Sequence, residues 1–191
     1  MDFSLTSDQE MIKSSARKFI ENECPKEDVR KLIHSAKGFD TALWRKMAEL
    51  GWMGLALPEA FEGVGYGMME LALVMEEIGR GLLPSPFLST VAEGALPILF
   101  FGNQEQKKRY LPSIAAGEAL WALALMEEDG GSGAMDIKMP ARREGDYYLL
   151  EGVKLFVPYA QAIDHFLVAV RTAEAKDPRE GITLLIVEAG S

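Results

Sequence analysis

Apolar residues recur at a helical spacing through the first 117 residues of the chain. Between positions 11 and 20, 43 and 50, and 69 and 78 they stand three or four positions apart, which is the pattern of an amphipathic helix. Asp40 is a typical N-cap for the second of these segments, and Pro25 and Gly51 end the first two. Val29 to Ala36 predicts a weaker, shorter helix. Because each segment carries an apolar face that needs a partner, we expect a bundle of packed helices.

Two more apolar segments follow in the helical half. Leu88 to Phe101 is almost entirely apolar but contains Pro97, which predicts a buried helix that is kinked or broken into two pieces. Asn103 and Gln106 stand three positions apart at the head of the next segment, which is the spacing of a capping box. Pro112 interrupts the helix that this box begins.

From position 119 the pattern changes to that of strands. Ala119 to Met126 is an apolar run of strand length, and the charged, glycine-rich stretch from Glu127 to Gly133 follows it. Tyr147 to Leu150 and Val153 to Tyr159 are two further strand-like runs, and with the first run they predict a local antiparallel meander. A strand, a glycine-rich exit and a returning hairpin would form a shallow cradle for a ligand. An ordinary β-meander with a surface loop is the alternative.

The last two strands are predicted from Asp164 to Arg171 and from Ile182 to Val187, with a charged loop between them. A strand at this point would need further strands to cover its edge, so we expect an incomplete β-barrel. The whole pattern predicts an α+β fold, in which an all-α helical N-terminal domain over residues 1–118 is followed by an antiparallel β domain over residues 119–191.

The composition is that of a globular protein. Of the 191 residues, 48% are hydrophobic and 26% are charged, and the formal net charge is −9. This charge argues against a nucleic-acid partner, because phosphate binding needs clustered cations. No apolar run has the length of a membrane span, and the N-terminal sequence is acidic and polar where a targeting peptide would be basic. We therefore expect a cytoplasmic protein.

Metal and nucleophilic chemistry find few residues to use. Cys24 is the single cysteine, which excludes an internal disulfide and a cysteine-based metal site. His34 and His165 stand in unrelated contexts, so a metal site or a catalytic triad is not expected. The glycines at 63, 65 and 67 lack the spacing of a dinucleotide fingerprint, and a turn leading into a helix explains them better than a phosphate loop.

Four segments, taken in order, resemble the acyl-CoA dehydrogenase family of flavoproteins. They are Leu50–Gly65, Phe101–Glu118, Ala122–Gly133 and Asp146–Arg171. The resemblance runs over essentially the whole chain. It implies a helical N-terminal domain, a middle β domain and a C-terminal helical domain, of which these residues carry the first and most of the second.

The resemblance also implies a reaction. In that family FAD accepts a hydride from the β carbon of an acyl-CoA thioester while a glutamate removes the α proton, and electrons then pass to an electron-transfer flavoprotein. That glutamate belongs to the C-terminal domain, so we assign no catalytic residue here. We expect these 191 residues alone to be inactive and to bind FAD weakly or not at all. We expect the full-length protein to form a homo- or hetero-oligomer.

The resemblance implies several ligand contacts. The cofactor-binding residues would be Leu123, Leu125 and Met126 on a first flavin-contacting strand, Ser132 on a phosphate loop, and Phe156, Val157 and Pro158 on a second flavin-contacting strand. Gly131 and Ser132 would also face the acyl-CoA substrate, although a solvated loop serine is the alternative for Ser132. Candidate cations near a phosphate are Arg142, Arg143, Lys154 and Arg171, each with an exposed solubilising role as the alternative.

Some residues depart from the family pattern. The family usually has threonine at the positions of Met126 and Pro158. Met126 lacks the threonine hydroxyl that would donate to the flavin ring, and Pro158 lacks both the hydroxyl and the backbone N–H. The set Glu128, Asp129 and Gly133 replaces a proline, a small residue and an aspartate. Glu127, in contrast, matches a position that orders the loop. Two hypotheses follow: the N-terminal part of an FAD-dependent acyl-CoA dehydrogenase, or a degenerate, non-catalytic partner subunit or binding module of a heteromeric acyl-CoA dehydrogenase.

Overall fold

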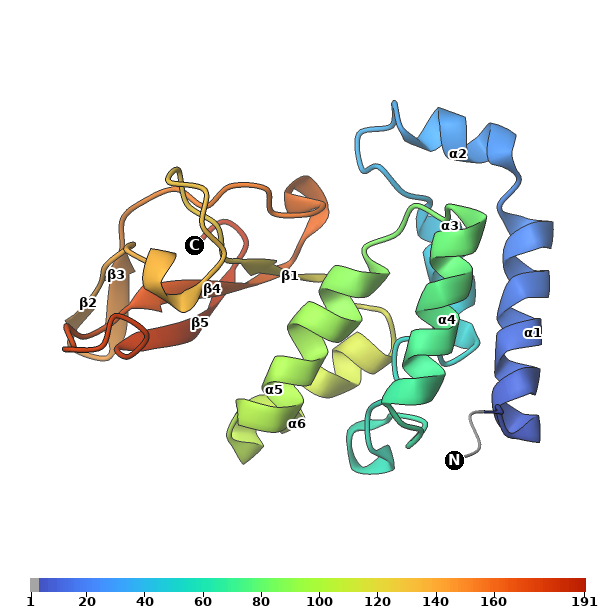
Figure 1. Cartoon of the computed structure of the whole chain (residues 1–191), viewed down its shortest axis with the longest axis horizontal. Helices are drawn as coiled ribbons and strands as arrows, with labels where there is room; N and C mark the ends of the chain where they lie inside the picture. The colour runs from blue at the N-terminus through green and yellow to red at the C-terminus, as the bar shows by residue number, and fades with distance from the viewer. Residues whose placement is uncertain (1–3) are drawn as a thin grey trace. The chain divides into compact units, whose positions relative to one another are not determined.

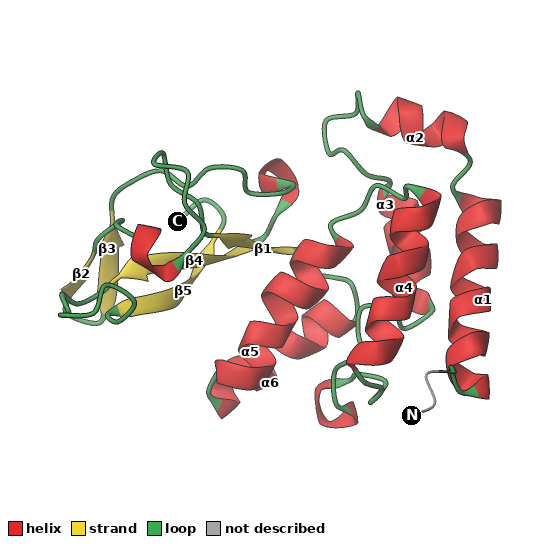
Figure 2. Ribbon diagram, in the orientation of Figure 1, coloured by secondary structure: helices red, strands yellow, loops and turns green. Residues whose placement is uncertain are grey.

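The computed structural model describes residues 4–191 (Figure 1). These residues divide into two compact units, one extending to Ala119 and one from Leu120 to Ser191. In the described residues, α-helices occur only in the first unit and β-strands only in the second (Figure 2). The predicted fold class, a helical domain followed by a β domain, is thereby confirmed. None of the helices described is long and apolar enough to cross a membrane.

The first unit is a set of packed helices. Its helices are α1 (Ser7–Glu23), α2 (Lys26–Leu32), α3 (Thr41–Glu49), a 3-10 helix (Glu59–Phe61), α4 (Met68–Gly81), a π-helix (Leu88–Ala95), α5 (Leu96–Phe101) and α6 (Gln104–Ala115). Helix α2 begins earlier than predicted because the fixed φ of Pro25, −64°, leads directly into it. Helix α6 runs through Pro112, since Leu111 and Ile114 are fully buried and hold it on the core.

Polar side chains cap these helices where the sequence predicts it. The Asp40 carboxylate accepts hydrogen bonds from the amides of Ala42 and Leu43 at 2.7 and 3.2 Å. Asn103 and Gln106 form the predicted capping box, in which each side chain accepts from the other's amide at 2.8 and 2.9 Å. Both caps are confirmed, and they satisfy amides that would otherwise have no partner at the helix start.

The stretch from Leu88 to Phe101 is broken into two pieces, as Pro97 predicts. A π-helix from Leu88 to Ala95 leads into α5, with Pro97 in the first turn of α5. Proline has no N–H to donate to the carbonyl four residues before it, at Glu93, so the α-helical hydrogen-bond pattern cannot continue across this point. The wider π-helical turn is the local solution.

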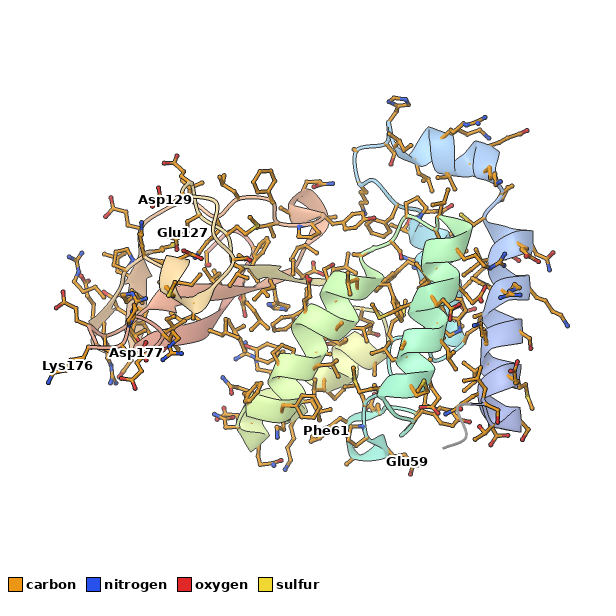
Figure 3. All side chains as sticks on the ribbon, in the orientation of Figure 1. Glu59, Phe61, Glu127, Asp129, Lys176 and Asp177 are labelled. Carbon is orange, nitrogen blue, oxygen red and sulfur yellow. The ribbon has the colours of Figure 1, made fainter. Side chains whose placement is uncertain are left out.

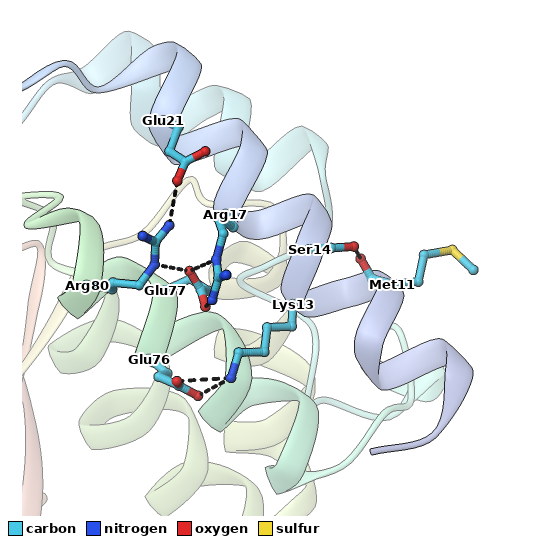
Figure 4. A network of polar contacts seen from close by, with 8 residues as sticks. All are labelled: Met11, Lys13, Ser14, Arg17, Glu21, Glu76, Glu77 and Arg80. Atoms are coloured by element: carbon cyan, nitrogen blue, oxygen red, sulfur yellow. Dashed lines mark hydrogen bonds and ion pairs between the residues drawn. The ribbon is translucent and has the colours of Figure 1, made fainter. Parts of the chain in front are cut away.

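An ion-pair network joins α1 to α4 (Figure 4). The Glu77 side chain is fully buried, and it accepts hydrogen bonds from Arg17 at 2.7 and 3.0 Å and from Arg80 at 2.6 Å. Arg80 also donates to Glu21 at 2.8 Å. Because the hydrogen bonds from Arg17 outweigh the effect of burial, the pKa of Glu77 falls to about 2.

The second unit contains two open sheets. Strands β1 (Trp121–Ala124), β4 (His165–Arg171) and β5 (Ile182–Glu188) form one sheet in the order β1-β4-β5, and β2 (Ala141–Glu144) pairs with β3 (Tyr147–Leu150) in the other. Strands β4 and β5 are antiparallel, as are β2 and β3. Strand β1 runs parallel to β4, which the long connection between them permits. Neither sheet closes into a barrel in the part of the chain that is described.

The predicted meander is wrong in its details. The hairpin partner of β3 is β2, reached through a turn with Gly145 at a φ of 66°. Val153 to Tyr159 forms no strand, and Leu155 makes a single isolated bridge to Met126. The physical reason lies in the backbone, because Phe156 and Tyr159 have φ values of 55° and 54° and turn the chain out of the extended conformation.

Candidate functional site

The exit of β1 and the segment around Leu155 lie side by side. The Leu155 amide donates to the Met126 carbonyl at 2.8 Å, which closes the isolated bridge between the two segments. Leu123, Leu125 and Met126 therefore lie on one side of this contact, and the segment that contains Phe156, Val157 and Pro158 lies on the other. The structure thus brings together the two segments that the resemblance implies for a flavin.

An open pocket of about 600 Å³ lies beside this bridge. Its lining includes Ala124, Met139, Leu150, Phe166, Val168 and Val187. Most of these residues also belong to the hydrophobic core of the unit, or pack against it. The pocket is therefore an extension of the apolar core to the surface, which is the usual character of a small-molecule site.

Two of the predicted cofactor residues, Phe156 and Val157, line this pocket. Phe156 is 81% exposed and has a φ of 55°, a left-handed conformation that is rare for a bulky side chain. Such a conformation persists only where the surrounding structure enforces it, and it concentrates at functional sites. An exposed aromatic ring held in this way at the rim of an apolar pocket is a surface on which a flat ligand could stack.

The other predicted residues do not line the pocket. Leu123, Leu125 and Met126 are partly buried, and Pro158 is exposed. Gly131 and Ser132 lie on the loop that follows β1, and Ser132 is exposed. The pocket and the predicted phosphate loop are therefore two neighbouring features, joined through Met139 and Gly152, which line both the pocket and a second hollow beside the loop.

Glu127 organises this loop. Its carboxylate accepts hydrogen bonds from the amides of Lys138, at 3.1 and 3.2 Å, and Met139, at 3.0 Å, and it pairs with the Lys154 ammonium group at 2.6 Å. Burial acts to raise the pKa of Glu127, but the bonds from Lys154 and the two amides outweigh it, so the pKa is lower than usual. The predicted role of Glu127 as a loop-ordering residue is confirmed.

The loop is closed by two further carboxylates. Figure 3 labels Asp129 near Glu127. Asp129 forms an ion pair with Lys138, and this pair lowers the pKa of Asp129. Asp136 accepts a hydrogen bond from the Gly133 amide at 2.9 Å. It also packs so tightly on Gly131 that a Cβ at that position would overlap its carboxyl group. Gly131 is therefore required by the contact of the loop with its own acid.

The candidate cations are used within the protein. The Lys154 side chain, only 6% exposed, also donates to the Leu125 carbonyl at 3.1 Å. The Arg171 guanidinium donates to the carbonyls of Ile137, Pro178 and Glu180 at 2.9 to 3.0 Å. Neither the phosphate role nor the solubilising alternative describes these two residues, because their side chains bond to carbonyl and carboxylate groups of neighbouring loops. Arg142 and Arg143 are exposed on β2.

The polar groups of the site do not fit a flavin nucleotide. Met126 offers no hydroxyl and Pro158 offers no N–H at the positions implied for the ring. The loop implied for the phosphates has amides and a lysine that already bond to Glu127, Asp129 and Asp136. The apolar lining and Phe156 fit the face of a flat ring, but its polar edge and its phosphates find no donors in these groups.

Sequence reasoning predicted only part of the pocket. The segment from Gly152 to Ala160, which contains the predicted Phe156 and Val157, lines it together with Met139 and residues of β1, β3, β4 and β5. The contributions of Met139 and of these strands were not predicted, because the only signal was the apolar run of each strand. The Glu127–Lys154 pair joins residues 27 positions apart, so no local pattern could have paired them.

Comparisons with known proteins match almost the whole chain to a single protein family. The family model described as "Acyl-CoA dehydrogenase, N-terminal domain" matches residues 6–118, and the one described as "Acyl-CoA dehydrogenase, middle domain" matches residues 122–191. The chain is 32% identical over 189 residues to a probable acyl-CoA dehydrogenase, YngJ, of Bacillus subtilis (strain 168), covering 98% of this chain and 49% of the relative. It spans about half the length of the curated relatives it matches.

Solved structures show the same fold. The ChsE4-ChsE5 complex from Mycobacterium tuberculosis superposes with a TM-score of 0.87 at 28% identity, over 100% of this chain and 49% of that one. A structure described as an electron transferring flavoprotein of Acidaminococcus fermentans superposes with a TM-score of 0.86 at 33% identity, over 100% of this chain and 50% of that one.

Proposed function

The chain belongs to the acyl-CoA dehydrogenase family, and from that membership we propose that it is the N-terminal part of a subunit of an FAD-dependent acyl-CoA dehydrogenase. The proposed reaction is the α,β-dehydrogenation of an acyl-CoA thioester, with a hydride passing to the flavin. The observation that carries the proposal is the bridge between Met126 and Leu155 beside an apolar pocket of about 600 Å³. The bridge joins the two segments implied for the flavin ring.

We propose that these 191 residues alone catalyse no turnover. The described residues that line the pocket include no aspartate, glutamate or histidine, so the pocket as described has no general base for the α proton. Glu127, which bonds to the pocket residue Lys154 and to two amides, has a lowered pKa. A lowered pKa makes a carboxylate a weaker base. Measurable enoyl-CoA formation by the 191-residue chain would contradict this.

A second candidate function is favoured by two observations. The ring donors are absent at Met126 and Pro158, and the phosphate loop is closed by its own acids, so the chain would serve as a non-catalytic subunit of a heteromeric acyl-CoA dehydrogenase. In that assembly a partner would supply the polar contacts to the flavin. A similar structure is described as the ChsE4-ChsE5 complex, which supports a hetero-oligomer.

Flavin content separates the two candidates. The full-length protein would be purified alone and together with candidate partner subunits, and its absorbance in the visible range would be measured. Yellow protein that oxidises an acyl-CoA on its own supports the first candidate. A colourless protein that acquires stoichiometric flavin only with a partner supports the second and overturns the first. As electron acceptor we propose an electron-transfer flavoprotein, which is checked by its reduction in the same assay.

A further inference from the structure

Four donors of the loop from Glu127 to Met139 bond to carboxylates of the same loop. The amides of Lys138 and Met139 donate to Glu127, and the Gly133 amide donates to Asp136. The ammonium group of Lys138 pairs with Asp129. A phosphate that bound these four donors would have to displace the carboxylates, because backbone amides and lysine are the groups that bind phosphate oxygens.

The charge of the loop opposes an anion as well. The carboxylates of Glu127, Glu128, Asp129 and Asp136 outnumber the ammonium groups of Lys138 and Lys154. The first three of these carboxylates line the hollow of about 410 Å³ beside the loop, together with Lys138. A pyrophosphate placed there would meet a net negative charge, which repels it most strongly at low ionic strength.

The neighbouring pocket has the opposite character. Apart from Lys154, its lining side chains are apolar. The ammonium group of Lys154 is turned to Glu127 and the Leu125 carbonyl. An uncharged ring would bury apolar surface in the pocket without disturbing any ion pair.

We infer that the Glu127–Met139 loop of this chain is closed to phosphate, and that the pocket beside it accepts an uncharged ring about as well as a flavin nucleotide. This deepens the proposed function, on which it rests, because it assigns the ligand class of the same site. It also separates two losses in the chain: the missing ring donors weaken every flavin alike, whereas the closed loop acts only against a phosphate.

The experiment compares ligands that share a ring and differ in phosphate. Lumiflavin, an uncharged isoalloxazine without sugar or phosphate, and FAD would be titrated into the 191-residue chain, with flavin fluorescence as the readout. We expect FAD to bind no more than about threefold tighter than lumiflavin at low salt, and the affinity of FAD relative to lumiflavin to rise as salt screens the repulsion. A larger preference for FAD, a fall of this ratio with salt, or no measurable lumiflavin binding would overturn the inference.

Asp129→Asn tests the loop directly. The substitution removes one negative charge and releases Lys138, so we expect FAD to bind roughly three- to tenfold tighter while lumiflavin binding stays unchanged. Glu174→Gln makes the same change of charge on the exposed loop between β4 and β5 and is expected to alter neither ligand. Equal effects of Asp129→Asn on both ligands, or none on FAD, would overturn the inference. The titrations involve no turnover, so their outcome is independent of whether the assembled enzyme dehydrogenates an acyl-CoA.

Discussion

Glu77 is a fully buried carboxylate whose charge is balanced by Arg17 and Arg80. Glu77→Gln would leave Arg17 without its carboxylate partner and Arg80 with Glu21 alone, and we expect the free energy of unfolding to fall by about 3 kcal/mol in urea denaturation. Glu76 is on the same helix as Glu77 and pairs with Lys13 of α1 at the surface. Glu76→Gln removes this pair and should lower the free energy of unfolding by less than about 1 kcal/mol. If both variants lost the same free energy of unfolding, burial of Glu77 would not be the reason for its larger contribution.

The same carboxylate makes the protein sensitive to acid. The pKa of Glu77 is about 2 in the folded protein, against 4.5 for an ordinary glutamate. A lowered pKa stabilises the fold above the unfolded value, and this stabilisation is lost as the pH falls from about 4.5 towards 2. We expect Glu77→Gln to lack this part of the acid transition. A pH titration of unfolding free energy that is parallel in the two proteins would contradict it.

Lys154 forms, with Glu127, an ion pair in the second unit that is comparable to that of Glu77 in the first. Lys154→Met would leave the partly buried Glu127 carboxylate without a cation, and we expect the free energy of unfolding to fall by about 3 kcal/mol, seen as faster amide hydrogen exchange in β1 and in the loop up to Met139. Arg142→Met removes an exposed cation from β2 and should cost less than about 0.5 kcal/mol. Exchange that quickens only in β2 and β3 after Lys154→Met would contradict the assignment.

At the scale of elements, α4 carries two glycines with opposite surroundings. A Cβ at Gly79 would meet no atom within 4 Å, so Gly79→Ala should raise the free energy of unfolding by about 0.5–1 kcal/mol through helix propensity. A Cβ at Gly81 would overlap the Ile20 side chain of α1, which is buried, so Gly81→Ala should lower it by about 1–3 kcal/mol. Chemical denaturation of both variants checks the pair. Stabilisation by both would show that α1 and α4 are not in close contact at Gly81.

The elements also show what the sequence could predict. The helices were predictable because burial on one face imposes the helical period, and the caps of α3 and α6 because they are local hydrogen bonds. Strand β2 was missed because most of its side chains are exposed and carry no apolar alternation. The segment around Phe156 was predicted as a strand because hydropathy does not report a positive φ.

The candidate site divides in the same way. The pairing of the Met126 and Leu155 segments was implied by resemblance, and the role of Glu127 followed from its position. The contacts of Lys154 and Asp136 could not be predicted, because they depend on how the loop folds back on itself. Long-range polar contacts of this kind leave no periodic trace in a sequence.

At the scale of the whole molecule, the two units have separate cores. The residues buried together around Val168 and Val170 all belong to the second unit, whereas Glu77 and Gly81 act between α1 and α4. We expect Gly81→Ala and Lys154→Met to be additive within about 0.5 kcal/mol when combined, since they share no contact. A double variant whose loss differs from the sum by more than this would reveal coupling between the units. Urea denaturation of the four proteins in this cycle makes the comparison.

The bond between Lys154 and Glu127 limits how this surface can be re-engineered. Lys154 is the one basic side chain among the described residues that line the pocket, and it is the obvious handle for anyone grafting an anionic substrate onto this face. If Lys154 bound such a substrate, Glu127 would lose its cation, and its hydrogen bonds from the amides of Lys138 and Met139 would be weakened. A designer would therefore have to introduce a second positive charge by substitution, since the Lys154 ammonium group already holds Glu127 in place.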